Sequence, residues 1–263
     1  MSERVTIGQY ISADTPIHRL DPRVKILLTI AYMVSVFLIE TYWGYLAAFC
    51  LIMGVMFLGQ VPAKRLFRGL RPLFAIVLLT FIINVLTTPG NVIASFWVFS
   101  ITDAGLSKAF FIAIRIMLLV LGTSLLTFTT SPLALTDGLE ALMKPLKVIR
   151  FPAHELAMMI SIALRFIPTL FDESDTILRA QKARGADFES GNILRRAKAM
   201  IPLMVPLFLN AFHRAEELGT AMEARCYRGG AGRTRLNPLN LTRRDVLTLL
   251  LSLAVLTGLC WFW

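Results

Sequence analysis

The sequence is short of cysteine and histidine, and these shortages exclude several kinds of site. The three cysteines, Cys50, Cys226 and Cys260, lie far apart and form neither a CxxC pair nor a Cys/His cluster. This spacing indicates neither a disulfide framework nor a zinc site. The three histidines also lack the close spacing of metal ligands on a helix. We therefore expect no metal and no cofactor.

A nucleotide-binding loop is also lacking. The run Gly-Gly-Ala-Gly-Arg-Thr at 229–234 has no lysine, has no leading glycine at the required distance, and follows a charged segment rather than a strand. We interpret it as a linker to the last apolar run. No carboxylate, histidine or serine constellation has a convincing catalytic spacing either. The chain is therefore not expected to be an enzyme, and any ATP hydrolysis is expected in partner subunits.

Apolar residues are abundant instead. Hydrophobic residues make up 56% of the 263 residues, the mean hydropathy is +0.66 and the net charge is +10. In a soluble protein such a charge would raise nucleic acid as a partner, whereas in a membrane protein basic residues mark cytoplasmic loops. We expect an all-α integral membrane protein in the cell (inner or plasma) membrane. The lipid bilayer is expected to be a partner of the chain, and nucleic acid is not.

Five apolar runs are expected to cross the bilayer. They lie at about 26–39, 42–58, 73–86, 109–128 and in the C-terminal segment 242–263. Charged residues precede the first run without a cleavable signal pattern, so the N-terminus is expected to be cytoplasmic. Starting inside, five spans place every basic loop on the cytoplasmic side. A sixth span between 150 and 215 stays open.

The charged residues divide the chain into three parts. Of the 27 Lys and Arg residues, 17 lie between Leu133 and Asp245. We therefore predict an N-terminal transmembrane region at 1–130, a cytoplasmic-side coupling-helix region at 131–241 and a C-terminal transmembrane helix at 242–263. The middle region is expected to hold one short amphipathic helix at 133–148 and two long helices.

The two long helices, from Pro152 to Gly185 and from Gly191 to Cys226, begin apolar and end charged. Each finishes on an Ala-Arg motif, and the motif residues are Ala183, Arg184, Gly185, Ala224, Arg225 and Cys226. A cation near a helix C-terminus is favoured by the helix dipole, and glycine often ends a helix, so one copy would mean little. Two copies favour docking, because guanidinium pairs well with a carboxylate of another protein. The pattern is typical of a coupling device.

Polar residues within the predicted spans are few. Arg115 either lines a substrate path or pairs with an acid elsewhere in the bundle, and we expect the second. Asn84 is expected to make a hydrogen bond between helices. The alternative function, a self-contained membrane permease or channel, requires several such residues to converge within the spans. A membrane-embedded enzyme is the third reading.

Three stretches together resemble a known family. They are the N-terminal Gly8-Gln9-Tyr10, Ser12 to Asp14, Pro16 and His18 to Lys25, then Ala183-Arg184-Gly185, and then Ala224-Arg225-Cys226-Tyr227. These residues are similar to those of the transmembrane T component of energy-coupling factor (ECF) transporters, the EcfT/CbiQ type, and the resemblance covers essentially the whole chain.

The resemblance implies a non-catalytic subunit of an ECF-type ABC importer for vitamins or transition-metal ions. Arg184 and Arg225 would sit in grooves of two cytosolic ABC ATPase subunits, a homodimer or a heterodimer. The apolar faces of the long helices would hold a membrane substrate-binding S component, through Met159, Leu170, Met200, Met204 and Phe208. Cys226 stands where the family usually has glycine, which leaves the backbone turn at this motif open. The sequence does not name the cargo.

Overall fold

The computed structural model of the chain describes residues 10–96, 99–149, 151–188, 192–230 and 238–262. Its backbone is mostly helical, which confirms the expected all-α membrane class. Two compact units are present. One comprises Gly8–Leu142 with Pro238–Trp263, and the other comprises Met143–Asn237. Each is described by itself, the first as the bundle unit and the second as the long-helix unit.

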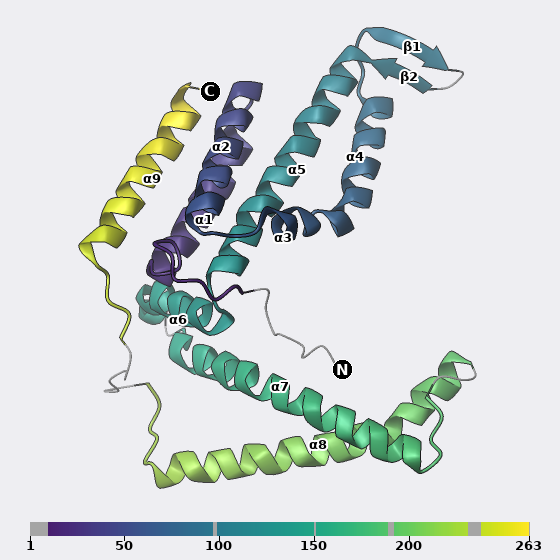
Figure 1. The fold of residues 1–263 in the computed structure, drawn as a ribbon, viewed down its shortest axis with the longest axis vertical. Helices are drawn as coiled ribbons and strands as arrows, with labels where there is room; N and C mark the ends of the chain where they lie inside the picture. Colours follow the sequence, from purple (N-terminus) through teal and green to yellow (C-terminus); the bar gives the residue numbers. More distant parts are fainter. Residues whose placement is uncertain (1–9, 97–98, 150, 189–191, 231–237, 263) are drawn as a thin grey trace. The chain divides into compact units, whose positions relative to one another are not determined.

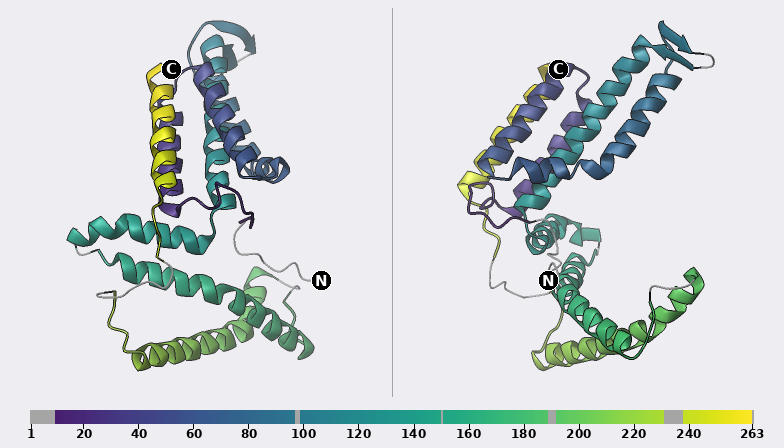
Figure 2. Two further views of the ribbon diagram at one scale, coloured as in Figure 1. Left: turned by 60° about the vertical axis from the view of Figure 1, so that its left-hand side comes forward. Right: turned by 45° about the vertical axis from the view of Figure 1, so that its right-hand side comes forward.

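The bundle unit contains most of the apolar helices. Its elements are α1 (Pro22–Leu38), α2 (Tyr42–Leu58), α3 (Ala63–Arg68), the 3-10 turn η1 (Arg71–Leu73), α4 (Phe74–Thr87), β1 (Val92–Phe96), β2 (Phe99–Thr102), α5 (Asp103–Thr129), α6 (Pro132–Met143) and α9 (Arg243–Phe262). Two views agree that α9 lies beside α1 and that α4 lies beside α5 (Figure 1; Figure 2).

Capping residues fix where these helices begin. Asp21 is the N-cap of α1 and accepts a hydrogen bond from the Arg23 amide at 2.9 Å, while Pro22 occupies the first helical position. Thr102 caps α5 in the same way, because its Oγ1 accepts from the Gly105 amide at 3.1 Å. Short local signals in the sequence therefore set the start of both helices.

Helix α5 packs against α1, α2, α3 and α4 and forms the centre of the bundle unit. It approaches α1 closely at Gly122, where a Cβ atom would lie 2.5 Å from a ring carbon of Tyr32. The Tyr32 hydroxyl donates to the Leu118 carbonyl at 3.4 Å. A larger side chain here would meet the buried Tyr32 ring, so the ring or the helix would have to shift.

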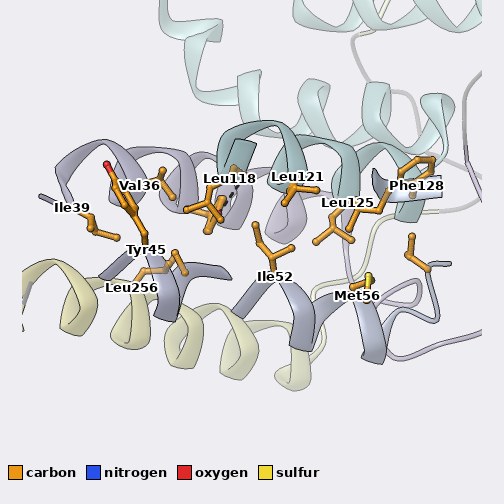
Figure 3. Packing of buried hydrophobic residues seen from close by; sticks show 14 residues of the cluster. Val36, Ile39, Tyr45, Ile52, Met56, Leu118, Leu121, Leu125, Phe128 and Leu256 are labelled. Atoms are coloured by element: carbon orange, nitrogen blue, oxygen red, sulfur yellow. Dashed lines mark hydrogen bonds between the residues drawn. The ribbon is translucent and has the colours of Figure 1, made fainter. Parts of the chain in front are cut away.

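Most of the buried core of the bundle unit comes from α1, α2, α5 and α9, with Val61 and Leu66 added from the segment after α2. Figure 3 shows side chains from α1, α2, α5 and α9 pointing toward one another. The labelled members include Val36, Tyr45, Ile52, Leu118, Leu121, Leu125 and Leu256. Other apolar side chains on these helices face outward, such as Phe57, which is 75% exposed. This combination is expected of helices that present an outer face to lipid.

A short β-hairpin joins α4 to α5 and was not predicted from the sequence. β1 and β2 pair antiparallel with Phe96 opposite Phe99, and a bulge lies between Val92 and Ala94. The strands follow the turn-forming residues Thr88-Pro89-Gly90-Asn91. The hairpin is a small addition to an otherwise helical fold.

The long-helix unit consists of the 3-10 segment η2 (Lys144–Ile149), α7 (Ala153–Ala183) and α8 (Ile193–Ala224). α7 has 31 residues and α8 has 32, so each is about 45 Å long. Pro168 lies inside α7, and Pro202 and Pro206 lie inside α8. The prolines do not end either helix.

Four helices of the described residues are long and apolar enough to cross a membrane, judged by length and composition. They are Ala63–Thr87, Asp103–Thr129, Ala153–Ala183 and Arg243–Trp261, and Tyr42–Leu58 is a shorter apolar helix. α7, one of the two long helices, is thus among the candidates. The five-span topology and its three-part division stay predictions.

Candidate functional site

The first Ala-Arg motif forms the C-terminal end of α7. Ala183 is the last helical residue and Arg184 is the C-cap. The Gly185 amide donates to the Lys182 carbonyl at 3.0 Å, and the Ala186 amide donates to the Gln181 carbonyl at 3.0 Å. These two bonds, with a φ of 86° at Gly185, define a Schellman turn.

The second motif ends α8 with the same turn. Ala224 is the last helical residue. The Cys226 amide donates to the Glu223 carbonyl at 2.8 Å, and the Tyr227 amide donates to the Met222 carbonyl at 3.0 Å. Cys226 has a φ of 54°, the left-handed conformation that usually requires glycine. The sequence left the backbone conformation at Cys226 open, and the structure shows a Schellman turn there, as at Gly185.

Both arginines of the pair are free to meet a partner. Arg184 and Arg225 are exposed, as are the alanines before them and Gly185 and Cys226 after them. Neither guanidinium has a hydrogen bond or an ion pair with any residue that the structure describes. Each guanidinium therefore presents N–H donors that no acceptor among the described residues engages.

Polar contacts link the C-terminal half of α7 to α8. Glu173 of α7 is 17% exposed; its Oε1 accepts from the amide of Asn210 on α8, and its Oε2 lies 3.3 Å from Arg214 Nη2. Gln181 Nε2 also donates to the Pro202 carbonyl at 3.4 Å. These pairings make the helices antiparallel, so the two arginine-bearing ends lie at opposite ends of the pair (Figure 1).

An apolar stripe runs along α8. Met200, Met204 and Phe208 follow one another at intervals of four residues and are 48%, 43% and 56% exposed. This spacing places the three side chains on one face of the helix. On α7, Met159 is 54% exposed and Leu170 is half-buried. Four of the five side chains predicted to face an S component are thus accessible within this chain.

The polar residues in the bundle differ from what the sequence predicted. Arg115 does not pair with an acid among the described residues. Its Nε donates to the Tyr45 hydroxyl at 2.9 Å, its Nη2 donates to the Ile39 carbonyl at 3.1 Å, and its guanidinium lies 5.8 Å from the ring centre of Phe37. Neutral acceptors and aromatic faces therefore satisfy this cation.

Asn84 also differs from the prediction of a bond between helices. Its side-chain amide donates to the Thr80 carbonyl at 2.8 Å, within α4. A hydrogen bond to the preceding turn is a common way for a helix to satisfy a short polar side chain. Asn84 therefore gives no evidence of a polar path.

The N-terminal segment that carries the family-like residues connects several helix ends of the bundle unit. Lys25 is 7% exposed, and its Nζ donates to the His18 and Thr129 carbonyls at 3.2 and 3.0 Å. The Asp21 amide donates to Asp245 Oδ1 at 3.2 Å. These bonds tie the start of α1 to the end of α5 and the start of α9. The N-terminal motif is visible in the sequence, whereas these bonding partners are not.

His18 is held in the same segment. Its Nδ1 is 2.7 Å from the Thr15 hydroxyl, and its ring packs edge-on against Tyr10. Burial, and then the nearby Lys25 charge, lower the pKa of this imidazole from its ordinary value. Asp14 makes two hydrogen bonds of 2.6 Å with Arg19, and these lower the pKa of the Asp14 carboxyl. Among the described residues no group of three or more His, Cys, Asp or Glu residues is placed to hold a metal ion.

Comparisons with known proteins cover almost the whole chain. Residues 13–236 match the family model described as CbiQ, cobalt transport protein. The energy-coupling factor transporter transmembrane protein EcfT of Thermosediminibacter oceani is 53% identical over 242 residues, which is 92% of this chain and 91% of the relative. The protein of the same name from Ruminiclostridium cellulolyticum is 50% identical over 98% of this chain and 96% of its own length. That from Bacillus subtilis is 45% identical over 100% and 99%.

Proposed function

The chain belongs to the CbiQ family of cobalt transport proteins, and from this premise we propose that it is the non-catalytic transmembrane T component of an ECF-type ABC importer. In this role it joins two cytosolic ABC ATPase subunits to a membrane S component that captures the substrate. The ATPases hydrolyse ATP, and this chain passes their movement to the S component. The cargo is a vitamin or a transition-metal ion.

The observation that carries the proposal is the repeated arginine turn. Arg184 and Arg225 occupy the same position in two Schellman turns, both are exposed, and neither has a partner among the described residues. Two equivalent tips suit two ATPase subunits, each offering a groove with acidic residues. A guanidinium in such a groove binds a carboxylate through two parallel hydrogen bonds, which fixes both position and orientation.

The S component is proposed to lie against the apolar faces of the long helices. The stripe of Met200, Met204 and Phe208 supports this, because exposed apolar side chains in a row mark a surface for protein or lipid. Methionine side chains repack easily, which suits a surface whose partner moves during transport. The bracing of Glu173 by Asn210 and Arg214 lets movement at one arginine tip reach the other helix.

Arg115 supports a coupling role over a self-contained permease. Its Nε donates to the Tyr45 hydroxyl and its Nη2 donates to the Ile39 carbonyl. A side chain satisfied in this way holds helices together and is not a free cation in a substrate path.

Reconstitution tests the proposal. The purified chain in liposomes is expected to transport nothing by itself, with or without ATP. Uptake is expected only when ECF-type ABC ATPase subunits and an S component are added. ATP-independent uptake by the chain alone would contradict the proposal and favour a permease.

A further inference from the structure

Four exposed cations lie in the segment between α2 and α4. Lys64, Arg65 and Arg68 lie in α3 and Arg71 lies in η1, and all four are exposed. Gly69 and Leu70 between them keep right-handed helical backbone angles, with φ and ψ of −62° and −22° and of −77° and −22°. Lys64, Arg68 and Arg71 are thus spaced at i, i+4 and i+7, which places them along one face. We name Lys64, Arg65, Arg68 and Arg71 the basic stripe.

The charge of the basic stripe is not neutralised locally. None of the four cations has a hydrogen bond or an ion pair with a described residue. The sequence contains no Asp or Glu between Glu40 and Asp103. Four unpaired positive charges within eight residues repel one another, and a bound anion relieves that repulsion.

The surroundings of the basic stripe are apolar. Leu66 is fully buried in the bundle core on the side of α3 away from the cations, whereas Phe67 beside them is 44% exposed. α4 follows immediately, and the stretch Ala63–Thr87 is apolar enough to cross a membrane. Its side chains Phe74, Ile76 and Leu79 are 65%, 55% and 58% exposed. The cations therefore lie at one end of an open apolar helix face.

From this placement we propose that the basic stripe binds the phosphate headgroups of anionic phospholipids whose acyl chains lie along α4. Guanidinium groups pair well with phosphate, and clusters of Lys and Arg next to a membrane span attract anionic lipid. A lipid molecule matches both halves of the site, since its phosphate meets the cations and its chains meet the apolar face. The inference rests on the proposed membrane orientation but not on the proposed ATPase partners.

Native mass spectrometry of the full-length chain in detergent tests this inference, with equal amounts of phosphatidylglycerol and phosphatidylcholine as probes. The unaltered chain is expected to retain phosphatidylglycerol preferentially. The variant K64Q/R65Q/R68Q/R71Q is expected to lose this preference, with affinity falling about fivefold for each cation that contacts a headgroup. Raising the salt concentration is expected to weaken binding to the unaltered chain. Free glycerol phosphate is expected not to displace the lipid, because it lacks acyl chains.

Two control variants make the test specific. R195Q/R196Q/K198Q/R228Q removes the same charge from exposed cations of the long-helix unit and is expected to keep the phosphatidylglycerol preference. R65K/R68K/R71K keeps the charge and is expected to bind nearly as well. An equal loss in the first control, or unchanged lipid binding in the Gln variant, would overturn the proposal. Equal retention of phosphatidylcholine and phosphatidylglycerol by the unaltered chain would overturn it as well. The assay contains no ATPase, so its outcome is independent of the proposed coupling function.

Discussion

Gly185 and Cys226 occupy the same place in the structure, one residue beyond an arginine that caps a long helix, and both have a positive φ, of 86° and 54°. The amides of Gly185 and Cys226 each donate to the carbonyl three residues back, and the amides that follow them each donate five residues back. The two motifs are therefore one structural device built from different residues. Since cysteine is strained in this conformation and glycine is not, the pair can be tested by exchange.

Replacing Cys226 with glycine is expected to stabilise the end of α8. A left-handed non-glycine residue costs about 1–2 kcal/mol, part of which the greater freedom of glycine in the unfolded chain offsets. Slower hydrogen exchange of the Tyr227 amide would show the gain. The reverse test, Gly185→Ala, is expected to speed exchange at the Ala186 amide. Equal exchange in all three proteins would mean that the turns do not depend on this position.

Removing the arginine tips is expected to weaken ATPase assembly. Arg184→Ala or Arg225→Ala would each remove a charge-assisted pair with a partner carboxylate, at a cost of about 2–5 kcal/mol if the pair is buried in the complex. The double variant is expected to abolish transport. Pull-down of the ATPase subunits measures the loss, with uptake measured on the same preparations.

The matched control for the tips is Arg195→Ala with Arg196→Ala, which removes two exposed arginines from the first turns of α8. We expect this control to retain the ATPases. Full uptake by the Arg184/Arg225 double variant would refute the role of the tips. The conservative change Arg184→Lys is expected to retain only part of the ATPase binding, because lysine cannot form two parallel hydrogen bonds with a carboxylate.

Glu173 is expected to brace α7 against α8. Glu173→Ala removes the acceptor of the Asn210 hydrogen bond and the ion-pair partner of Arg214, and it is expected to cost about 1–3 kcal/mol because both groups lose a partly buried carboxylate. Faster hydrogen exchange in the middle of both helices would reveal the loosening. Asp172→Ala, which removes the exposed neighbouring carboxylate, serves as the control. An equal effect of both changes would rule out a specific brace.

The stability of the bundle unit is expected to depend on pH through His18. The pKa of His18 in the folded chain is below its ordinary value of 6.5. Between these two values the unfolded chain binds more protons than the folded chain, so the free energy of unfolding rises with pH up to about 6.5 and is level above it. Apparent unfolding temperatures in detergent from pH 5 to 8 measure this, and His18→Gln is expected to reduce the slope. A slope unchanged by that substitution would assign it to another group.

Local sequence signals predicted much of the helical framework. Asp21 followed by Pro22 marks the start of α1, and Gly185 marks the end of α7, because a cap depends on only a few neighbouring residues. The long helices were predicted at 152–185 and 191–226 and are observed as Ala153–Ala183 and Ile193–Ala224. The predicted and observed C-terminal boundaries agree within two residues because each helix ends at an Ala-Arg motif that can be recognised in the sequence.

Long-range partners were beyond the sequence. Arg115 was expected to find an acid but meets Tyr45 and the carbonyl of Ile39, which lie 70 and 76 residues away along the chain. The last carbonyls of a helix have no partner within the helix, and because every residue type has a carbonyl, the sequence does not show which one will act as the acceptor. For the same reason the contacts of Glu173 and Lys25 could not be predicted, although both residues were visible as charges. The turn at Cys226 was left open because residue type alone predicts strain there, while the backbone bonds that impose the turn come from its neighbours.

Each Schellman turn has a consequence for the arginine that precedes it. The carbonyls of Gln181 and Lys182, and those of Met222 and Glu223, already receive amide hydrogens from the main chain. Main-chain amides therefore satisfy these carbonyls at the helix ends, and neither guanidinium donates to them. All five N–H groups of each side chain remain on offer to whatever approaches from outside.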